Sequence, residues 1–464
     1  MRILVATFTL LVVSGSMADE STIASLLREY LRAGGDAERA AIARRIAADA
    51  ALDMKKMPTW LHTCGAHDPL DAGTRMLSVA LENGESRTVH VRVPQAYDPK
   101  RPWPLIVGYH GTGGDGAEFI EFVSRMLGAR ADEFVIAAPT DYGQRVINQG
   151  GPPSTEHVEV LIALRKLCHI DNDRVYATGY SLGGHTVWTL ALIHPDQFAA
   201  CIPLAGSLVL PDTERYFPDF LPNARHTLVA AVWGAKDTTD VTFANQSPQG
   251  GIAGINRRLA TECAKLNLRL LSHEYADKGH GGIAPPPEML DQALAARRQH
   301  APRELHHTFR NLAQAPSYWV EPRSWRGPSW GDNAEFKGTL RKDEDPRDAL
   351  AREIRKRLGR IEASVDGQTI TLRRKNVDDV VIWLGDDLVD WAAPVKINHM
   401  GKVVFDDGVA PDVELCLAQV TRTWDFDRLR WSGIIISGGK KPVVLHGADP
   451  LPPRRHAEDS KTDR

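Results

Sequence analysis

The sequence contains little that would tie it to a metal or a nucleic acid. Only five of its 464 residues are cysteines, and no C-x-x-C or H-E-x-x-H pattern indicates a metal site. Lys and Arg number 56 against 59 Asp and Glu, which gives a net charge of −3. This balance predicts no special affinity for nucleic acid or for a charged membrane surface.

Apolar runs long enough to cross a bilayer are also missing. The run at 3–13 is too short, and no later run is long enough. That run follows Arg2 and precedes Ser-Met-Ala at 16–18, which places small residues at −3 and −1 of a cleavage site. We predict that residues 1–18 are a signal peptide and that the mature protein is secreted or periplasmic, without membrane insertion. In such an oxidising compartment an odd number of cysteines leaves at least one unpaired.

Residue patterns divide the rest of the chain into four parts. Residues 19–57 contain amphipathic helical stretches and form a short N-terminal helical arm. Residues 58–315 alternate short apolar runs with helix-length segments. Residues 316–450 begin as a Trp-rich linker and continue as a β-rich accessory domain, and the charged tail at 451–464 is predicted to be disordered.

The alternation within 58–315 predicts the fold of that part. Strand-like runs at 105–107, 134–138 and 174–178 are almost wholly apolar, and helical stretches lie between them. Strands of this kind are buried on both faces, as in a parallel sheet covered by helices. We therefore expect an α/β, doubly wound, mainly parallel sheet.

The C-terminal part predicts a sandwich-like domain. Asp-Gly at 366–367 lies between two alternating runs and is a strong hairpin signal. Seven of the eleven tryptophans follow residue 315, and they could fill a core or stack on sugar rings. Trp325 and Trp330 have the polar neighbours expected of exposed residues, so contact with polysaccharide is one expectation for this domain and packing is the other.

A serine stands in a pattern that carries chemistry. The sequence G-Y-S-L-G-G at 179–184 lies between a strand-like run and a helical stretch. There a G-x-S-x-G pattern forms a sharp turn that projects its serine, and the glycines avoid clashes with nearby backbone. The following helix points its first N–H groups toward developing negative charge. We predict Ser181 as a catalytic nucleophile.

A glycine-rich loop further upstream fits the same chemistry. H-G-T-G-G at 110–114 follows the strand-like run at 105–107. Glycines let a backbone approach a substrate carbonyl closely, and two N–H groups can then hold the oxyanion. We predict that the backbone N–H groups of Thr112 and Leu182 form this oxyanion hole.

An acid and a histidine follow the serine in chain order. Asp237 comes just past the strand-like run at 227–232, and His280 lies in a G-H-G-G loop after another such run. A histidine can accept the serine proton while an acid orients its imidazole. We predict His280 as the base, titrating near the usual histidine pKa of about 6.5. Asp237 is the predicted acid, with Asp240 as second choice.

These motifs resemble the polyhydroxybutyrate depolymerase, feruloyl esterase and acetyl xylan esterase group of secreted α/β hydrolases. The shared features are H-G-T-G-G, G-Y-S-L-G-G, the strand-end G-x-x-D and the G-H-G-G loop, within residues 87–285. The resemblance implies an α/β-hydrolase fold and carboxylic-ester hydrolysis through an acyl-enzyme, with no cofactor. It implies a small or polymeric ester substrate and does not choose the acyl group.

Three other functions share parts of this pattern. A serine peptidase of the prolyl-oligopeptidase type has the same elbow and residue order, together with a large N-terminal propeller that is not evident here. The G-x-G-x-x-G at 111–116 fits a nicotinamide dinucleotide site, although the acidic residue expected after the next strand is poorly placed. The third is a binding protein built on a catalytically inactive hydrolase fold.

Overall fold

The computed structural model describes residues 16–140, 155–208, 218–239, 250–326, 339–447, 449, 451 and 455–456. The chain falls into two compact units, one ending at Ala66 and the other starting at His67. The apolar run of the predicted signal peptide, at 3–13, lies outside the described residues, as do Asp240 and Trp330.

The N-terminal unit is helical, with α1 (Ser16–Arg32), α2 (Asp36–Ala47), the 3₁₀ turn η1 (Met54–Lys56) and α3 (Met57–Thr63). Ile23 and Leu27 lie on one stripe of α1 and are buried. Gly35 is the N-cap of α2, and Asp36 lies in its first turn, where a carboxylate interacts favourably with the helix dipole.

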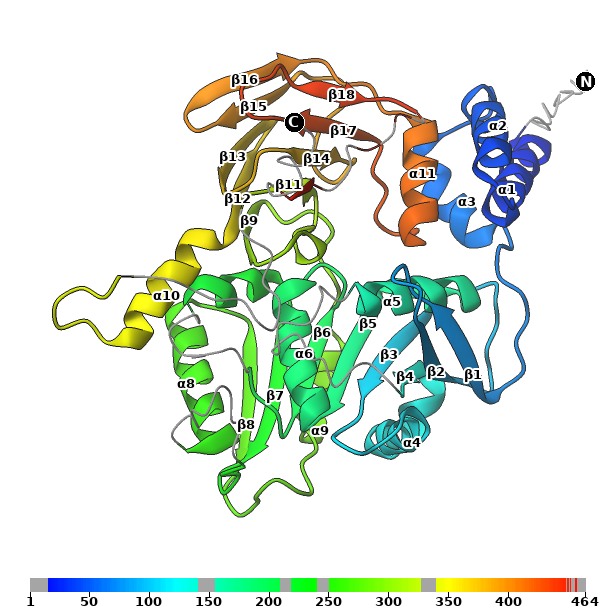
Figure 1. The fold of residues 1–464 in the computed structure, drawn as a ribbon. Coiled ribbons are helices and arrows are strands. Elements are labelled where there is room, and N and C mark those ends of the chain that lie inside the picture. Colours follow the sequence, from blue (N-terminus) through cyan, green and yellow to red (C-terminus); the bar gives the residue numbers. More distant parts are fainter. Residues whose placement is uncertain are drawn as a thin grey trace, which may run out of the picture. The chain divides into compact units, whose positions relative to one another are not determined.

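The second unit contains an eight-stranded sheet in the order β1-β2-β4-β3-β5-β6-β7-β8 (Figure 1). Its strands are β1 (Gly73–Ala80), β2 (Ser86–Val93), β3 (Trp103–Tyr109), β4 (Val135–Pro139), β5 (Ile170–Tyr180), β6 (Ala200–Leu204), β7 (Leu228–Gly234) and β8 (Leu270–Tyr275). Strands β1 and β2 pair antiparallel, and β2 pairs antiparallel with β4. The remaining pairs are parallel. The predicted mainly parallel sheet is confirmed.

Helices cover both faces of this sheet. They are α4 (Gly116–Leu127), α5 (Glu156–Leu167), α6 (Leu182–Ile193), α8 (Gly251–Lys265) and α9 (Pro287–Leu294). Buried side chains of α5, α6 and α8 share one core, and those of α4 and α9 share another on the opposite face. Strands β3, β4, β6 and β7 are buried along their whole length, which explains their nearly continuous apolar sequences.

Two smaller sheets form a β-rich region whose facing side chains make one core, as in a sandwich. The first has the order β16-β15-β13-β12-β9, with β9 (Glu304–Phe309), β12 (Gly359–Asp366), β13 (Thr369–Lys375), β15 (Val395–His399) and β16 (Lys402–Asp407). The second has the order β10-β14-β17-β18, with β10 (Val320–Pro322), β14 (Val380–Leu384), β17 (Ser432–Ile436) and β18 (Val443–Leu445). The predicted hairpin joins β12 to β13, and Gly367 adopts a φ of +55° in its turn.

Shorter elements complete the described chain: the helices α10 (Pro346–Arg357) and α11 (Val413–Thr423), the 3₁₀ turns η2 (Gly128–Glu133), η4 (Leu221–His226) and η5 (Leu312–Gln314), and the two-residue strands β11 (Ser324–Trp325) and β19 (Arg455–His456). Helix α11 contributes to a small core on the outer face of β14. Strand β19, within the predicted C-terminal tail, pairs with β11.

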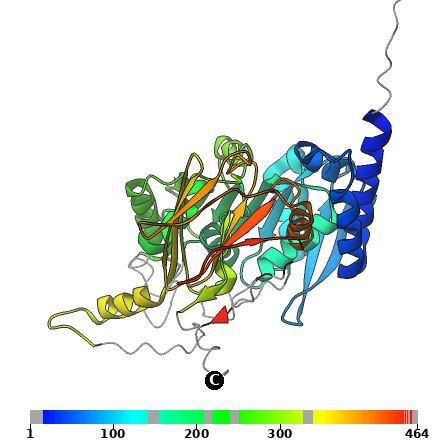
Figure 2. The same ribbon diagram turned by 90° about the horizontal axis from the view of Figure 1, so that it is seen from above.

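The change in composition at Pro316 does not coincide with the border between the large sheet and the β-rich region. Strand β9 precedes Pro316, where the composition changes, yet it pairs with β12. Helix α10 follows Pro316, yet Ala351 and Ile354 belong to the core beneath α5, α6 and α8. Figure 1 shows the β-rich region, in yellow-green to red, beyond the edge at which the parallel strands begin, and in the view of Figure 2 the region lies in front of the large sheet. Ser181 follows the end of β5, so it belongs to the opposite edge.

The tryptophans of this region are mostly core residues. Trp319, Trp325 and Trp431 are at most 1% exposed, and Trp383 is 5% exposed. The expected exposure of Trp325 is therefore wrong. Its indole N–H donates to the carbonyl of Arg357 over 3.2 Å, a tertiary partner that polar neighbours in the sequence do not reveal. Packing, rather than sugar stacking, is the role that these four side chains can fill.

Candidate active site

Ser181 lies at the turn between β5 and α6. Its φ of 55° and ψ of −114° are strained for a residue with a side chain, as expected at a nucleophile elbow. A Cβ on Gly183 would lie 1.8 Å from the carbonyl oxygen of Tyr109, and one on Gly179 would lie 2.3 Å from the oxygen of Gly183. Only glycine fits these two positions, so the turn depends on both.

The structure brings the three predicted catalytic side chains together. Ser181 Oγ lies 2.8 Å from His280 Nε2. His280 Nδ1 lies 2.8 Å from Asp237 Oδ2. If Nδ1–H donates to the carboxylate, Nε2 is free to accept the serine proton, which is the arrangement that a serine nucleophile needs.

Burial and hydrogen bonds determine the charges of Asp237 and His280. Burial raises the pKa of Asp237, but hydrogen bonds from His280 and from the backbone N–H of Thr239 outweigh it and bring the pKa below its usual value. The hydrogen bond to Asp237 raises the pKa of His280, against the effect of burial. Asp237 is thus held as a carboxylate, and the protonated form of His280 is stabilised.

The loops that carry the acid and the histidine are joined through their backbones. The N–H of Lys236 donates to the carbonyl of Lys278 over 2.9 Å. A Cβ on Gly234 would lie 2.2 Å from the oxygen of Gly279, so the strand-end glycine allows this close approach. Two segments far apart in the sequence are thereby held side by side.

The predicted oxyanion loop reaches the nucleophile. A Cβ on Gly111 would lie 3.5 Å from Ser181 Cβ, which places the loop that contains Thr112 beside the serine. Gly113, with a φ of 78°, takes a left-handed conformation that favours glycine. Leu182 is the first residue of α6, so its N–H has no partner within the helix.

Sequence reasoning missed one side chain of this site. Tyr180 occupies the variable position of the G-x-S-x-G pattern, yet its hydroxyl donates to the carbonyl of His280 over 2.6 Å. The ring of Tyr180 also meets the imidazole edge to face, with centroids 6.1 Å apart. A pattern that leaves this position open carries no signal for such a contact.

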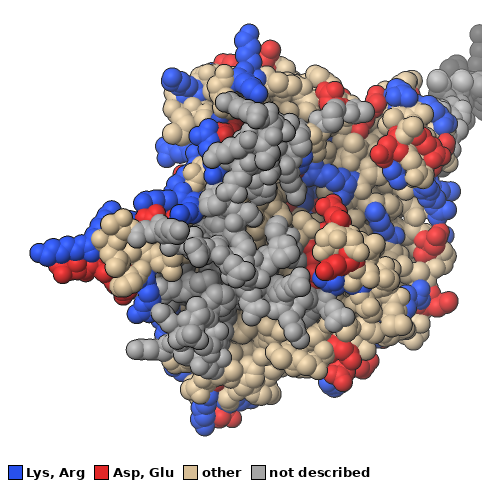
Figure 3. Space-filling view, viewed as in Figure 1, with Lys and Arg blue, Asp and Glu red and all other residues tan. Residues whose placement is uncertain are grey.

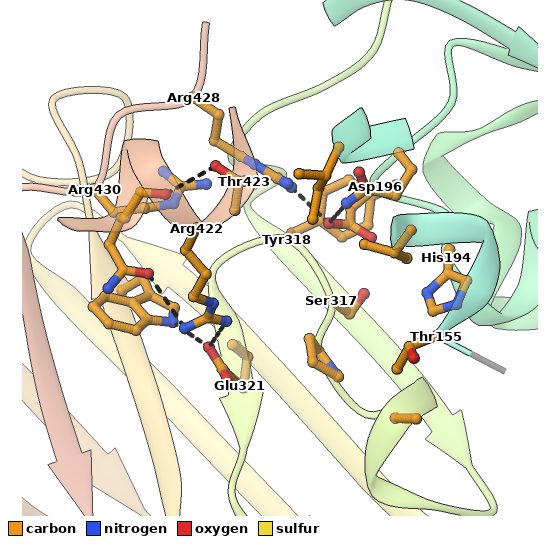
Figure 4. A pocket seen from close by; sticks show the side chains of 18 of the residues that line it. Thr155, His194, Asp196, Ser317, Tyr318, Glu321, Arg422, Thr423, Arg428 and Arg430 are labelled. Carbon is orange, nitrogen blue, oxygen red and sulfur yellow. Dashed lines mark hydrogen bonds and ion pairs between the residues drawn. The ribbon is translucent and has the colours of Figure 1, made fainter. Parts of the chain in front are cut away.

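A cavity of about 200 Å³ lies away from Ser181, at the far end of α6. Figure 4 shows two ion pairs on its walls. Arg422 contacts Glu321 at 2.7 Å, and Arg428 contacts Asp196 at 2.6 Å. The walls come from α5, the loop after α6 and the β-rich region, and they include none of Ser181, Asp237 and His280, so the cavity is not part of the candidate active site.

Other features bear on binding only weakly. Within the described residues, no group of three His, Cys, Asp or Glu side chains is placed to hold a metal ion. None of the described helices is both long and apolar enough to span a membrane. All five cysteines are unpaired and buried. Acidic and basic side chains are interspersed over the described part of the face in Figure 3, in keeping with the small net charge.

Comparisons with known proteins support the resemblance carried by the motifs. No family model matches the chain. Feruloyl esterase C of Emericella nidulans is 30% identical over 156 residues, which are 32% of this chain and 53% of the relative. "Probable feruloyl esterase C" of Aspergillus terreus is 26% identical over 138 residues, which are 29% of this chain and 51% of the relative. The chain spans about half the length of these curated relatives.

Solved structures give matches of the same kind. A ferulic acid esterase is 14% identical with a TM-score of 0.38, over 48% of this chain and 96% of that one. A thermostable esterase is 20% identical with a TM-score of 0.37, over 48% of this chain and 63% of that one. The names of the curated relatives confirm the predicted resemblance to the feruloyl esterase group.

Proposed function

We propose that this protein is a serine hydrolase that cleaves carboxylic esters through Ser181, His280 and Asp237. The observation that carries the proposal is the unbroken row of contacts from Ser181 Oγ to His280 and on to Asp237, each 2.8 Å long. The strained elbow supports it, because strain at a non-glycine residue persists only where the surrounding structure enforces it. The curated relatives, both named feruloyl esterases, make an ester the favoured substrate class.

The proposed mechanism has two matched halves. Ser181 Oγ attacks the ester carbonyl carbon while its proton passes to His280 Nε2, and the N–H groups of Thr112 and Leu182 hold the oxyanion. The tetrahedral intermediate then releases the alcohol, which takes the proton from Nε2 and leaves an acyl group on Ser181. Water repeats the same steps and frees the carboxylic acid.

The hypothesis that the glycine-rich loop at 111–116 binds a dinucleotide has less support than ester hydrolysis. Asp115 is the N-cap of α4, and its side chain accepts a hydrogen bond from the N–H of Glu118 over 2.9 Å. A pyrophosphate at that helix N-terminus would meet the carboxylate of Asp115. This carboxylate already accepts from an N–H group of the first turn, and its negative charge would repel the pyrophosphate. Gly116 is explained by packing instead, because a Cβ there would lie 2.3 Å from the carbonyl oxygen of Ala138.

Substrate choice is tested by a panel of soluble esters with acetyl, feruloyl, hydroxybutyryl and long-chain acyl groups. We expect hydrolysis of at least one of them, with feruloyl esters the first to examine because of the relatives' names. A matched panel of peptide amides covers the peptidase alternative. Cleavage of amides without any ester turnover would overturn the proposed substrate class.

Export is also part of the proposal, supported by the charge, apolar run and small residues at 2–18. Amino-terminal sequencing of the mature protein tests it, with Asp19 as the expected first residue. Contact of the β-rich region with polysaccharide remains a weaker proposal, since the four buried tryptophans offer no stacking surface.

Activity should rise with pH as His280 loses its proton, because only the neutral imidazole can accept the proton of Ser181. The hydrogen bond to Asp237 raises the pKa of His280 above its ordinary value of 6.5. The midpoint of kcat/KM should therefore lie above 6.5, higher than the sequence alone indicates. A pH series on a soluble ester measures it, and a flat profile from acid to neutral pH would argue against a histidine base.

A further inference from the structure

The loop that carries His280 is rich in glycine and needs anchors. Gly279, Gly281 and Gly282 surround the histidine, and Gly282 has a φ of 68°. Glycine has the largest backbone freedom of any residue. Catalysis nevertheless requires the imidazole to stay within hydrogen-bond distance of Ser181, and small displacements of a catalytic group are costly in rate.

Tyr180 provides an anchor at the histidine itself. Its hydroxyl donates to the carbonyl of His280 over 2.6 Å and accepts from the N–H of Ile283 over 3.4 Å. One hydroxyl therefore bridges both ends of the segment 280–283. Burial raises the pKa of Tyr180, so the hydroxyl keeps its proton throughout the neutral range and remains a donor.

The ring of Tyr180 is itself fixed by packing. It meets the ring of Phe122 edge to face with centroids 5.7 Å apart, and Phe122 stacks on Phe119 at 5.2 Å. Both phenylalanines belong to α4, the helix that begins just after the predicted oxyanion loop. Tyr180 thus contacts the histidine loop and α4 while being the chain neighbour of Ser181.

We propose that Tyr180 is a positioning residue that holds His280 in register with Ser181. This inference rests on the proposed function of the serine and the histidine. Tyr180 acts through the backbone of the histidine loop, and its hydroxyl is engaged there on both sides. It therefore sets the rate of the chemical step and leaves substrate binding unchanged.

Tyr180→Phe tests the proposal because it removes the hydroxyl and keeps the packed ring. The loss of one hydrogen bond at the base predicts a decrease in kcat of about three- to tenfold with KM unchanged. A looser loop also weakens the bond from His280 to Asp237, which is what raises the histidine pKa. The acid limb of the pH profile should therefore move to lower pH.

Tyr176→Phe is the matched control. Tyr176 lies on the same strand, and its buried hydroxyl also donates to a backbone carbonyl, that of Leu294 at 2.6 Å. Its loss should lower the thermal stability while leaving kcat and the pH midpoint at wild-type values. If Tyr180→Phe matches this control in kcat and midpoint, the positioning role is wrong.

The two proposals fail in different ways. Wild-type protein that hydrolyses no ester and takes up no fluorophosphonate at Ser181 would overturn the proposed function. If the wild-type protein does both and Tyr180→Phe has the wild-type kcat and pH midpoint, only the role of Tyr180 is overturned. Thermal unfolding of both variants excludes loss of the fold as the cause of a lowered rate.

Discussion

Replacing Ser181 by alanine is expected to lower kcat by roughly six orders of magnitude, the size of effect seen when a serine nucleophile is removed. The variant loses the oxygen that is proposed to form the acyl-enzyme, while the proposed oxyanion hole at Thr112 and Leu182 stays in place. The fold should survive, because the Ser181 hydroxyl contacts only His280 among the hydrogen bonds of the described residues. Steady-state hydrolysis of the best soluble ester measures the change.

Ser124→Ala serves as the control for this substitution. Ser124 is on α4, where its buried hydroxyl has no hydrogen-bond partner in the described residues. Its replacement should leave kcat within about twofold of wild type, since it removes no group near the elbow. A Ser181→Ala variant that keeps more than about a thousandth of the wild-type turnover would show that another group is the nucleophile.

Replacing Asp425 by asparagine is expected to lower the free energy of unfolding by about 3–5 kcal/mol, as when one partner of a buried ion pair is removed. Arg298 contacts Asp425 through two hydrogen bonds, of 2.6 and 3.0 Å, and neither side chain is exposed. Burial alone would raise the pKa of Asp425, but Arg298 and Arg428 hold it well below its usual value. The substitution leaves a buried guanidinium without its main counter-charge.

Urea unfolding of the full chain measures this loss, with Glu262→Gln as the control. Glu262 pairs with Lys265 at 2.7 Å on the surface of α8, and a pair of that kind contributes less than about 1 kcal/mol. If Asp425→Asn lowers the free energy of unfolding no more than this control does, the pair of Arg298 and Asp425 does not hold the β-rich region and the large sheet together.

This pair also bears on the role of the β-rich region. Arg298 follows α9, whereas Asp425 follows α11, 127 residues later. Nearby, Arg165 of α5 donates to the carbonyl of Thr423 over 3.2 Å. Because these contacts lie where the parallel strands begin, the region supports the large sheet from the edge opposite Ser181. We therefore expect truncation of the chain near residue 315, which removes this region except for β9, to unfold the protein and abolish turnover of small and polymeric esters alike.

The parts of the site that the sequence predicts are those with a local signal. A side chain at Gly179 or Gly183 would place its Cβ less than 2.5 Å from a backbone oxygen, so a short pattern records both glycines. Asp237 and His280 each follow the end of a strand, and parallel strands bring such ends to one edge of a sheet. Chain order and strand position therefore predict that the two side chains meet, and they lie 2.8 Å apart in the structure.

The parts that the sequence does not predict depend on distant partners. The contact of Tyr180 with His280 joins residues 100 positions apart, and a serine elbow accepts many side chains at that position. The sequence gives no signal for strand β1, because this edge strand has mostly exposed residues and lacks the apolar run that marks the central strands. The predicted exposure of Trp325 is wrong because its neighbours in the sequence are not its neighbours in space: its indole N–H donates to the carbonyl of Arg357, 32 residues away.

We propose Ser181 as the nucleophile and His280 as the base that activates it. The most direct measurement is mass spectrometry of the protein after treatment with a fluorophosphonate, with peptide mapping of the adduct. We predict a single adduct on Ser181 in the wild-type protein. We predict no adduct in His280→Ala, which retains Ser181 but lacks the imidazole that accepts its proton. An unmodified protein, or an adduct on a different residue, would show that Ser181 is not an activated nucleophile.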